Sequence, residues 1–72
     1  MYNASVIAER IKTLRKEKGI SQKELADGAK IGLSTVKQYE TGKRVPEKHN
    51  LSLIANYFGV LEGWIVGDTP YK

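Results

Sequence analysis

Apolar residues recur along this chain at the spacing of one helical face, and turn residues divide it into short segments. Ser5 or Asn3 can cap a first helix over residues 5–18, and Gly19 lies where a left-handed residue ends one. Its apolar face, at i, i+4 and i+7, consists of Ile7, Ile11 and Leu14. No apolar–polar alternation with a period of two runs for a useful length, so no sheet is expected.

The middle of the chain predicts two short helices. Ser21 and Glu24 have the spacing of a capping box, in which the hydroxyl accepts from the third helical N–H and the glutamate reaches back. A helix is therefore expected to begin at Gln22, with an inner face made of Leu25, Ala26 and Ala29. Residues 33–40 predict the next helix, because Val36 and Tyr39 recur there at i and i+3 and form its inner face.

Two further helices are expected after a loop at residues 41–46, where Gly42 ends one helix and Pro46 cannot continue it. The most regular amphipathic pattern follows at residues 47–58, in Leu51, Ile54, Ala55 and Phe58. A last helical turn at residues 60–66 surrounds Trp64. We expect one domain over residues 1–67, with residues 68–72 as a frayed tail or the start of a linker.

Length and composition narrow the class of protein. Seventy-two residues can close only a single core, and 40% hydrophobic with 28% charged residues is ordinary for a globular protein. The absence of cysteine excludes a disulfide framework and a cysteine-ligated zinc site. No apolar run approaches the roughly 20 residues that span a bilayer. The first four residues do not read as a signal peptide.

Positive charge is concentrated in the first two thirds of the chain. The net charge is +4, with a balance of +5 in residues 1–48 and −1 in residues 49–72. This asymmetry indicates either a surface that faces a polyanion or lysines that only solvate a small protein.

The most informative stretch is residues 22–41, two helices joined by a short connection. Ala26 falls where the two helices cross most closely, and a larger side chain would push them apart. Ile31 and Val36 fill the angle between the two helices. This is the unit that sets its second helix in the major groove of DNA.

At these residues the chain resembles the phage-repressor-like helix-turn-helix domains of the Cro/CI (Xre) type. The resemblance covers about residues 6–67, and the matching runs are 20–26, 34–46, 53–55, 59–60 and 64–67. It implies an all-α, compact five-helix lambda-repressor-like fold. It also implies a cytoplasmic transcriptional regulator, a repressor of phage or prokaryotic origin that binds a double-stranded DNA operator as a homodimer.

The resemblance also implies roles for individual residues. The groove-facing positions of the recognition helix, about residues 33–40, are Leu33, Ser34, Lys37 and Gln38, with Thr35 at the exposed start. Gln22 resembles the glutamine that touches a phosphate and supports this helix. Lys43 and Arg44 lie in the loop that follows the phosphate backbone. Arg15 and Glu40 resemble an ion pair that ties the first helix to the recognition helix.

Side-chain chemistry supports these roles independently. Gln38 can form a bidentate pair with adenine, and Lys37 can donate to guanine or to a phosphate. Lys43 and Arg44 can neutralise phosphates. Several of the four basic residues Arg10, Lys23, Lys43 and Arg44 are expected to neutralise phosphates together.

Several positions depart from the family pattern. Lys30 replaces a glycine in the connection, so either Lys30 is left-handed or the turn is shifted. Gly28, inside a predicted helix, costs about 1 kcal/mol relative to alanine. Gly32 and Leu61 replace capping residues and supply no side-chain oxygen. Leu33 stands where polar base-readers are common; it either contacts a thymine methyl group or packs on its own domain.

Two other classes of function are compatible with a small helical domain. A protein-interaction module of the same fold, such as an antitoxin or anti-repressor partner, is the alternative to base-specific DNA binding. An enzyme is not expected, because the one histidine, His49, has no second ligand or base within helical reach and reads as a solvated residue. No metal, cofactor, membrane or small-molecule substrate is expected. The aromatic residues near the end, Tyr57, Phe58 and Trp64, together with Ile65, form core or part of a dimer surface.

Overall fold

A computed structural model describes residues 3–72, and these residues form five helices and no strand. The helices are α1 (Ala4–Lys18), α2 (Gln22–Ala29), α3 (Leu33–Glu40), α4 (Lys48–Phe58) and α5 (Glu62–Val66). The predicted all-α, five-helix architecture is confirmed. Helix α4 begins one residue later than the pattern predicted and α5 two residues later, and neither has a side-chain cap.

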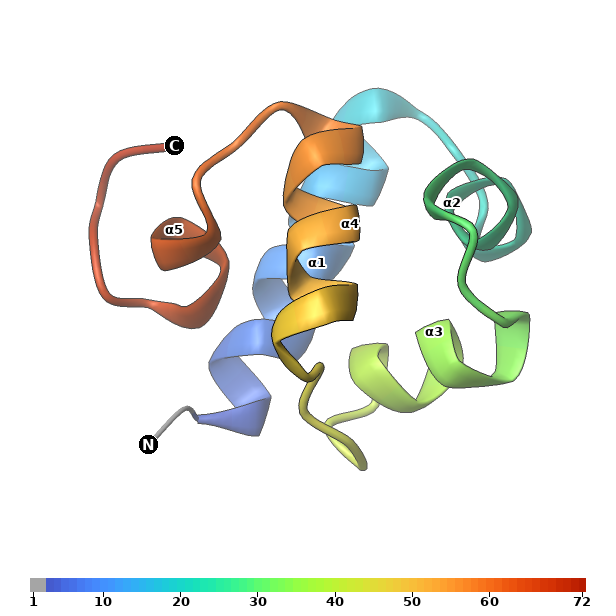
Figure 1. The fold of residues 1–72 in the computed structure, drawn as a ribbon, viewed down its shortest axis with the longest axis horizontal. Helices are drawn as coiled ribbons and strands as arrows, with labels where there is room; N and C mark the ends of the chain where they lie inside the picture. The colour runs from blue at the N-terminus through green and yellow to red at the C-terminus, as the bar shows by residue number, and fades with distance from the viewer. Residues whose placement is uncertain (1–2) are drawn as a thin grey trace.

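Figure 1 shows α4 in front of α1 near the centre of the view, with α2 and α3 on one side of these two helices and α5 on the other. Helix α1 packs against α3 and α5, α2 packs against α3 and α4, and α4 also packs against α5. Helix α3 is therefore held from behind by two helices, which leaves its opposite face open.

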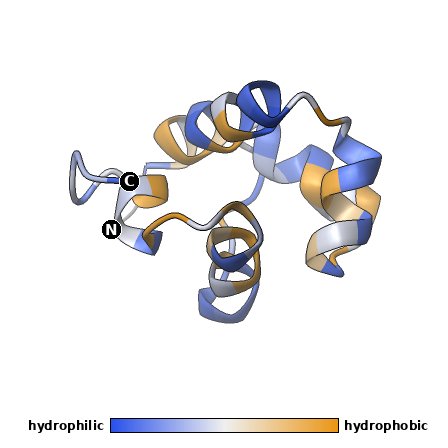
Figure 2. Ribbon diagram, turned by 90° about the horizontal axis from the view of Figure 1, so that it is seen from above, coloured by the Kyte–Doolittle hydropathy of each residue, from blue (hydrophilic) through white to orange (hydrophobic). Residues whose placement is uncertain are grey.

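One hydrophobic core joins all five helices. Apolar and polar residues divide each of the longer helices into two faces, as Figure 2 shows. The apolar residues with no exposed surface come from every helix: Ile7, Ile11, Leu25, Val36, Tyr39, Ile54 and Ile65. Trp64 is also buried, whereas Tyr57 and Phe58 are half-buried. Trp64 and Ile65 therefore belong to the core of a single chain.

Local hydrogen bonds fix where the first two helices begin. Asn3, not Ser5, caps α1: its Oδ1 accepts from the backbone N of Ser5 at 2.8 Å. The predicted capping box of α2 is present. The Ser21 Oγ accepts from the Glu24 backbone N at 3.0 Å, and the Glu24 Oε1 accepts from the Ser21 backbone N at 2.9 Å.

Lys30 ends α2 in the left-handed conformation, with φ 59° and ψ 46°. The backbone N of Ile31 donates to the carbonyl of Ala26 at 2.9 Å, which closes the helix end as glycine does in other proteins. The turn is therefore in its expected register, and the lysine bears the strain, about 1–2 kcal/mol, of a left-handed backbone.

Gly28 lies under an aromatic ring of α4. A Cβ at position 28 would come within 2.3 Å of the Tyr57 Cε1. The same ring is held by the Lys18 ammonium, 5.5 Å from its centroid, and by the edge-to-face Phe58 ring at 5.2 Å. Gly28 thus leaves the space in which the Tyr57 ring packs, and the sequence pattern of α2 alone does not show this role.

The residues after α5 fold back onto the domain. The Leu61 backbone N donates to the Lys72 carbonyl at 3.2 Å, and the Lys72 Nζ lies 2.8 Å from the Glu17 Oε1. The Lys72 ammonium also lies 5.0 Å from the centroid of the Trp64 ring. Lys72 therefore contacts α1 and α5, whereas Asp68, Pro70 and Tyr71 are exposed. That residues 68–72 form a tail or the start of a linker stays a prediction.

Helices α4 and α5 are joined by polar contacts that the sequence pattern did not indicate. Glu62 accepts hydrogen bonds from the Lys48 ammonium and from the Ser52 hydroxyl. These two hydrogen bonds lower the pKa of the Glu62 carboxyl below its usual value, and the bond from Lys48 has the larger effect. They hold the first residue of α5, which has no conventional cap.

Among residues 3–72, no helix is long and apolar enough to cross a membrane.

Replacement of Gly28 by alanine is expected to destabilise the fold, although alanine gains about 1 kcal/mol in helix propensity. The added methyl group must displace the Tyr57 ring, and overpacking of this kind costs about 1–3 kcal/mol. In a Tyr57→Ala background the same change should instead stabilise by about 1 kcal/mol. Urea unfolding of the four proteins measures both effects. An equal effect of Gly28→Ala in both backgrounds would contradict this packing.

Candidate nucleic-acid interface

Helix α3 divides sharply into a buried face and an exposed face. Val36, Tyr39 and Glu40 are between 0% and 2% exposed. Thr35 is half-buried between the two faces. The side chains predicted to face the groove lie on the opposite face and are exposed: Leu33, Ser34, Lys37 and Gln38.

Tyr39 attaches α3 to α4 and to the loop before it. Its ring has no exposed surface, and its hydroxyl accepts from the Asn50 Nδ2 at 2.9 Å and donates to the Glu47 Oε1 at 3.4 Å. Burial raises the pKa of the Tyr39 hydroxyl above its usual value. The sequence placed Tyr39 in the core but gave no sign of these partners, because they depend on how α4 packs.

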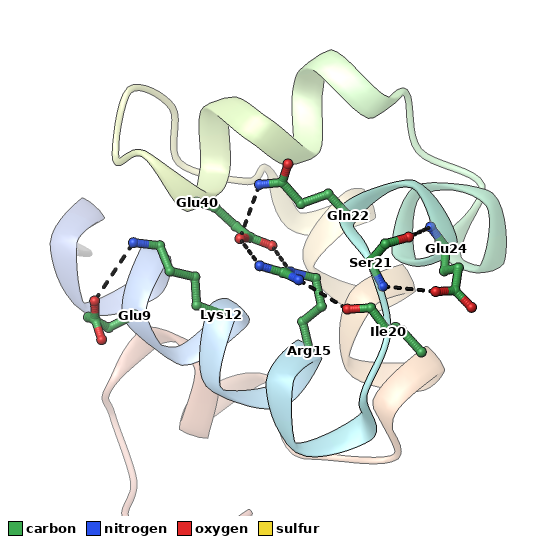
Figure 3. A network of polar contacts seen from close by, with 8 residues as sticks. All are labelled: Glu9, Lys12, Arg15, Ile20, Ser21, Gln22, Glu24 and Glu40. Carbon is green, nitrogen blue, oxygen red and sulfur yellow. Dashed lines mark hydrogen bonds and ion pairs between the residues drawn. The ribbon is translucent and has the colours of Figure 1, made fainter.

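A buried carboxylate connects α3 to both preceding helices (Figure 3). Arg15 donates to Glu40 through two nitrogens, Nε at 2.8 Å and Nη2 at 3.1 Å. The Gln22 Nε2 donates to the same carboxylate at 3.2 Å. The third Arg15 nitrogen donates to the Ile20 carbonyl at 3.0 Å. Arg15 and Glu40 thus form a bidentate ion pair between α1 and α3, and Gln22 supports α3 from the start of α2.

Two predicted phosphate-binding positions lie at the start of α2. Gln22 is half-buried, and one of its amide N–H groups is used on Glu40, which leaves the other available. Lys23 is exposed and lies 2.9 Å from Asp27 in an i, i+4 pair. Because both partners of that pair are exposed, it holds the lysine only weakly.

The loop after α3 presents two more cations to solvent. Gly42 is left-handed with φ 77°, and the backbone N atoms of Lys43 and Arg44 donate to the Gln38 carbonyl at 3.0 and 3.3 Å. Both side chains are exposed, and the Arg44 Nη2 lies 3.7 Å from the Glu47 Oε2. The loop is therefore tied to the end of α3, with its basic side chains pointing outward.

Every exposed charged side chain within residues 33–44 is positive. Over residues 33–44 the basic side chains are Lys37, Lys43 and Arg44, and all are exposed. The single acid in this stretch, Glu40, is buried and neutralised by Arg15. An exposed helix face with cations and no accessible carboxylate attracts a polyanion.

Arg10, one of the four candidate phosphate-binding cations, contacts another helix. Its guanidinium lies 4.4 Å from the centroid of the Trp64 ring, and its Nη1 donates to the Trp64 carbonyl at 2.9 Å. Arg10 therefore binds α5, on the other side of the molecule from α3 (Figure 1). Its cation–π contact and hydrogen bond are satisfied within the domain.

Leu33 is 36% exposed at the first position of α3. It is only partly packed on its own domain, and the rest of its side chain faces outward beside the polar residues of this face.

Within residues 3–72, no group of three or more histidine, aspartate or glutamate side chains converges in a way that could hold a metal ion.

A five-helix domain with this pair of crossed helices and an open, basic second helix is the architecture of a helix-turn-helix DNA-binding domain. Residues 11–65 match the helix-turn-helix family. The chain therefore belongs to the helix-turn-helix family of the Cro/CI (Xre) type, a class of DNA-binding transcriptional regulators.

A similar protein is the cryptic phage CTXphi transcriptional repressor RstR of Vibrio cholerae. It is 30% identical over 64 residues, which cover 89% of this chain and 58% of the relative. The chain thus spans little more than half the length of the curated relative that it matches. No solved structure matches the chain with statistical significance.

Arg15→Ala is expected to destabilise the domain by about 2–3 kcal/mol, because it leaves the Glu40 carboxylate buried without its partner. Glu40→Ala should cost a similar amount. In a double-mutant cycle the two changes should be coupled by more than about 1 kcal/mol. Lys23→Ala, at the exposed pair with Asp27, is the matched control and should cost less than about 0.5 kcal/mol. Additive effects of Arg15→Ala and Glu40→Ala would show that the pair does not act as a unit.

Proposed function

We propose that this chain binds a specific double-stranded DNA operator, with α3 in the major groove, and acts as a transcriptional repressor of phage or prokaryotic origin. The observation that carries the proposal is the division of α3 into a buried face and an exposed face whose only charges are positive. The similarity to a phage repressor supports the direction of regulation.

The proposal assigns base contacts to the exposed face of α3. Gln38 has a donor and an acceptor that fit the edge of adenine, and Lys37 can donate to guanine. Both side chains are exposed, and neither forms a hydrogen bond or ion pair within the described part of the chain. Ser34, Thr35 and Leu33 lie at the start of the helix, next to the bases that α3 would reach first.

Phosphate contacts flank this face on both sides. Gln22 and Lys23 lie at the start of α2, where helical N–H groups favour an anion, and Lys43 and Arg44 lie in the loop after α3. The exposed apolar residues lie on separate segments: Leu33, Val45, Leu61 and Tyr71. Such a distribution does not favour the alternative, a protein-interaction module that uses the exposed face of α3.

We further propose that two copies bind two half-sites about one helical turn of DNA apart. Leu61 is 53% exposed and follows the half-buried Phe58 and Val60 at the junction of α4 and α5. This junction lies away from α3, so its use by a second copy leaves the DNA-facing surface open (Figure 1).

Gln38→Ala is expected to weaken binding to the cognate site by roughly 1–3 kcal/mol, because one bidentate base contact is lost. Its effect on scrambled duplex should be much smaller, since glutamine carries no charge. Lys37→Ala is the matched control on the same exposed face, and part of its loss should persist on scrambled duplex. The site is first selected from random duplexes, and both variants are then titrated against it. Equal losses of Gln38→Ala on the two duplexes would remove Gln38 from the base-reading set.

The double variant Lys43→Ala, Arg44→Ala is expected to weaken binding to all duplex sequences about equally. Each lost phosphate contact should reduce the slope of log K against log salt by about 0.9. Binding titrations from low to physiological salt measure the slope. A wild-type affinity that does not change over this range would contradict phosphate binding by this surface altogether.

A further inference from the structure

A polar hollow of about 590 Å³ lies between α1 and the end of α3, outside the face of α3 described above. One wall is a stripe of α1 that carries Glu9, Lys12 and Lys16, and Thr41 and Gly42 line the hollow at the end of α3. Gln22 lines it at the start of α2 (Figure 3). The buried Arg15–Glu40 pair also lines the hollow.

The hollow has an excess of positive charge that the domain itself does not neutralise. Arg15 and Glu40 cancel each other. Lys12 lies 3.8 Å from Glu9 in a pair whose side chains are 37% and 76% exposed, which is a weak interaction. Lys16 is exposed and has no carboxylate partner among residues 3–72. Most other basic side chains in the described chain are paired with a carboxylate or packed on a ring.

The hollow is continuous with the surface that carries the phosphate-binding loop. Gly42 lies against the first turn of α1, since a Cβ there would be 3.9 Å from the Ala4 carbonyl oxygen. Lys43 follows directly in the same loop. Lys12 and Lys16 are four residues apart on one helix, so they are neighbours about 6 Å apart along the axis. Two adjacent cations on one line suit an extended chain of phosphates better than a single small anion.

We propose that α1 is part of the DNA interface and that Lys12 and Lys16 bind phosphate oxygens of the backbone strand that also contacts Gln22. This inference rests on the proposed function and extends its phosphate contacts to α1. Another cation of this part of α1, Arg10, instead contacts Trp64 of α5. The helix thus presents different cations to its two sides.

Single variants Lys12→Gln and Lys16→Gln test the proposal on the full chain, with Lys18→Gln as the control. Lys18 is on the same helix and carries the same charge, but it lies over the Tyr57 ring and not in the hollow. Lys12→Gln and Lys16→Gln should each reduce the salt slope by about 0.9 and weaken binding roughly fivefold at 0.15 M salt. Lys18→Gln should leave the slope unchanged. Circular dichroism melting checks that all three variants fold.

A neutral backbone analogue separates direct contact from a general effect of charge. A selected duplex is made with single methylphosphonates along the strand next to Gln22. At one or two positions the substitution should weaken wild-type binding several-fold and have little effect on Lys16→Gln. Slopes for Lys12→Gln and Lys16→Gln equal to that of Lys18→Gln, or methylphosphonate losses unchanged in the variants, would overturn the inference. If the wild-type chain binds no duplex at all, the proposed function itself fails.

Discussion

The position of α3 depends on one buried carboxylate. Glu40 belongs to the last turn of α3, yet its side chain is only 2% exposed, and it accepts hydrogen bonds from Arg15 of α1 and Gln22 of α2. The removal of two charges from water offsets much of their attraction, so the pair contributes more to geometry than to stability. A planar guanidinium that donates twice permits only a narrow range of angles between α1 and α3. The exposed face of α3 is thus aimed by a contact on its opposite face.

Much of the fold could be predicted from the sequence, because the determining signals are local. The apolar spacing of Ile7, Ile11 and Leu14 and the capping box of Ser21 and Glu24 act within one or two helical turns. The starts of α4 and α5 were predicted too early because no local cap marks them. Glu62, at the start of α5, is instead held by Lys48 and Ser52, and residues so far apart in sequence leave no periodic signal.

The candidate interface could be predicted only where helical periodicity decides it. The period of α3 separates Lys37 and Gln38 from Val36 and Tyr39 without any knowledge of the neighbouring helices. The direction of Arg10 could not be obtained in this way, because its partner Trp64 is 54 residues away in the sequence. The same holds for Gly28. The sequence of α2 does not show why a glycine stands there, because the ring that leaves no room for a Cβ belongs to Tyr57 of α4.

The only tryptophan of the chain has two cations close to its ring, from opposite ends of the sequence. Arg10 is 4.4 Å and Lys72 is 5.0 Å from the centroid of the Trp64 ring. The environment of the indole therefore depends on the arrangement of α1, α5 and the last residues, and α5 lies across the molecule from α3 (Figure 1). Its fluorescence is consequently an intrinsic optical reporter for events at the α5 side, such as release of the final residues or contact with a second copy. DNA in contact with α3 would be detected by it only if binding also rearranged that distant side.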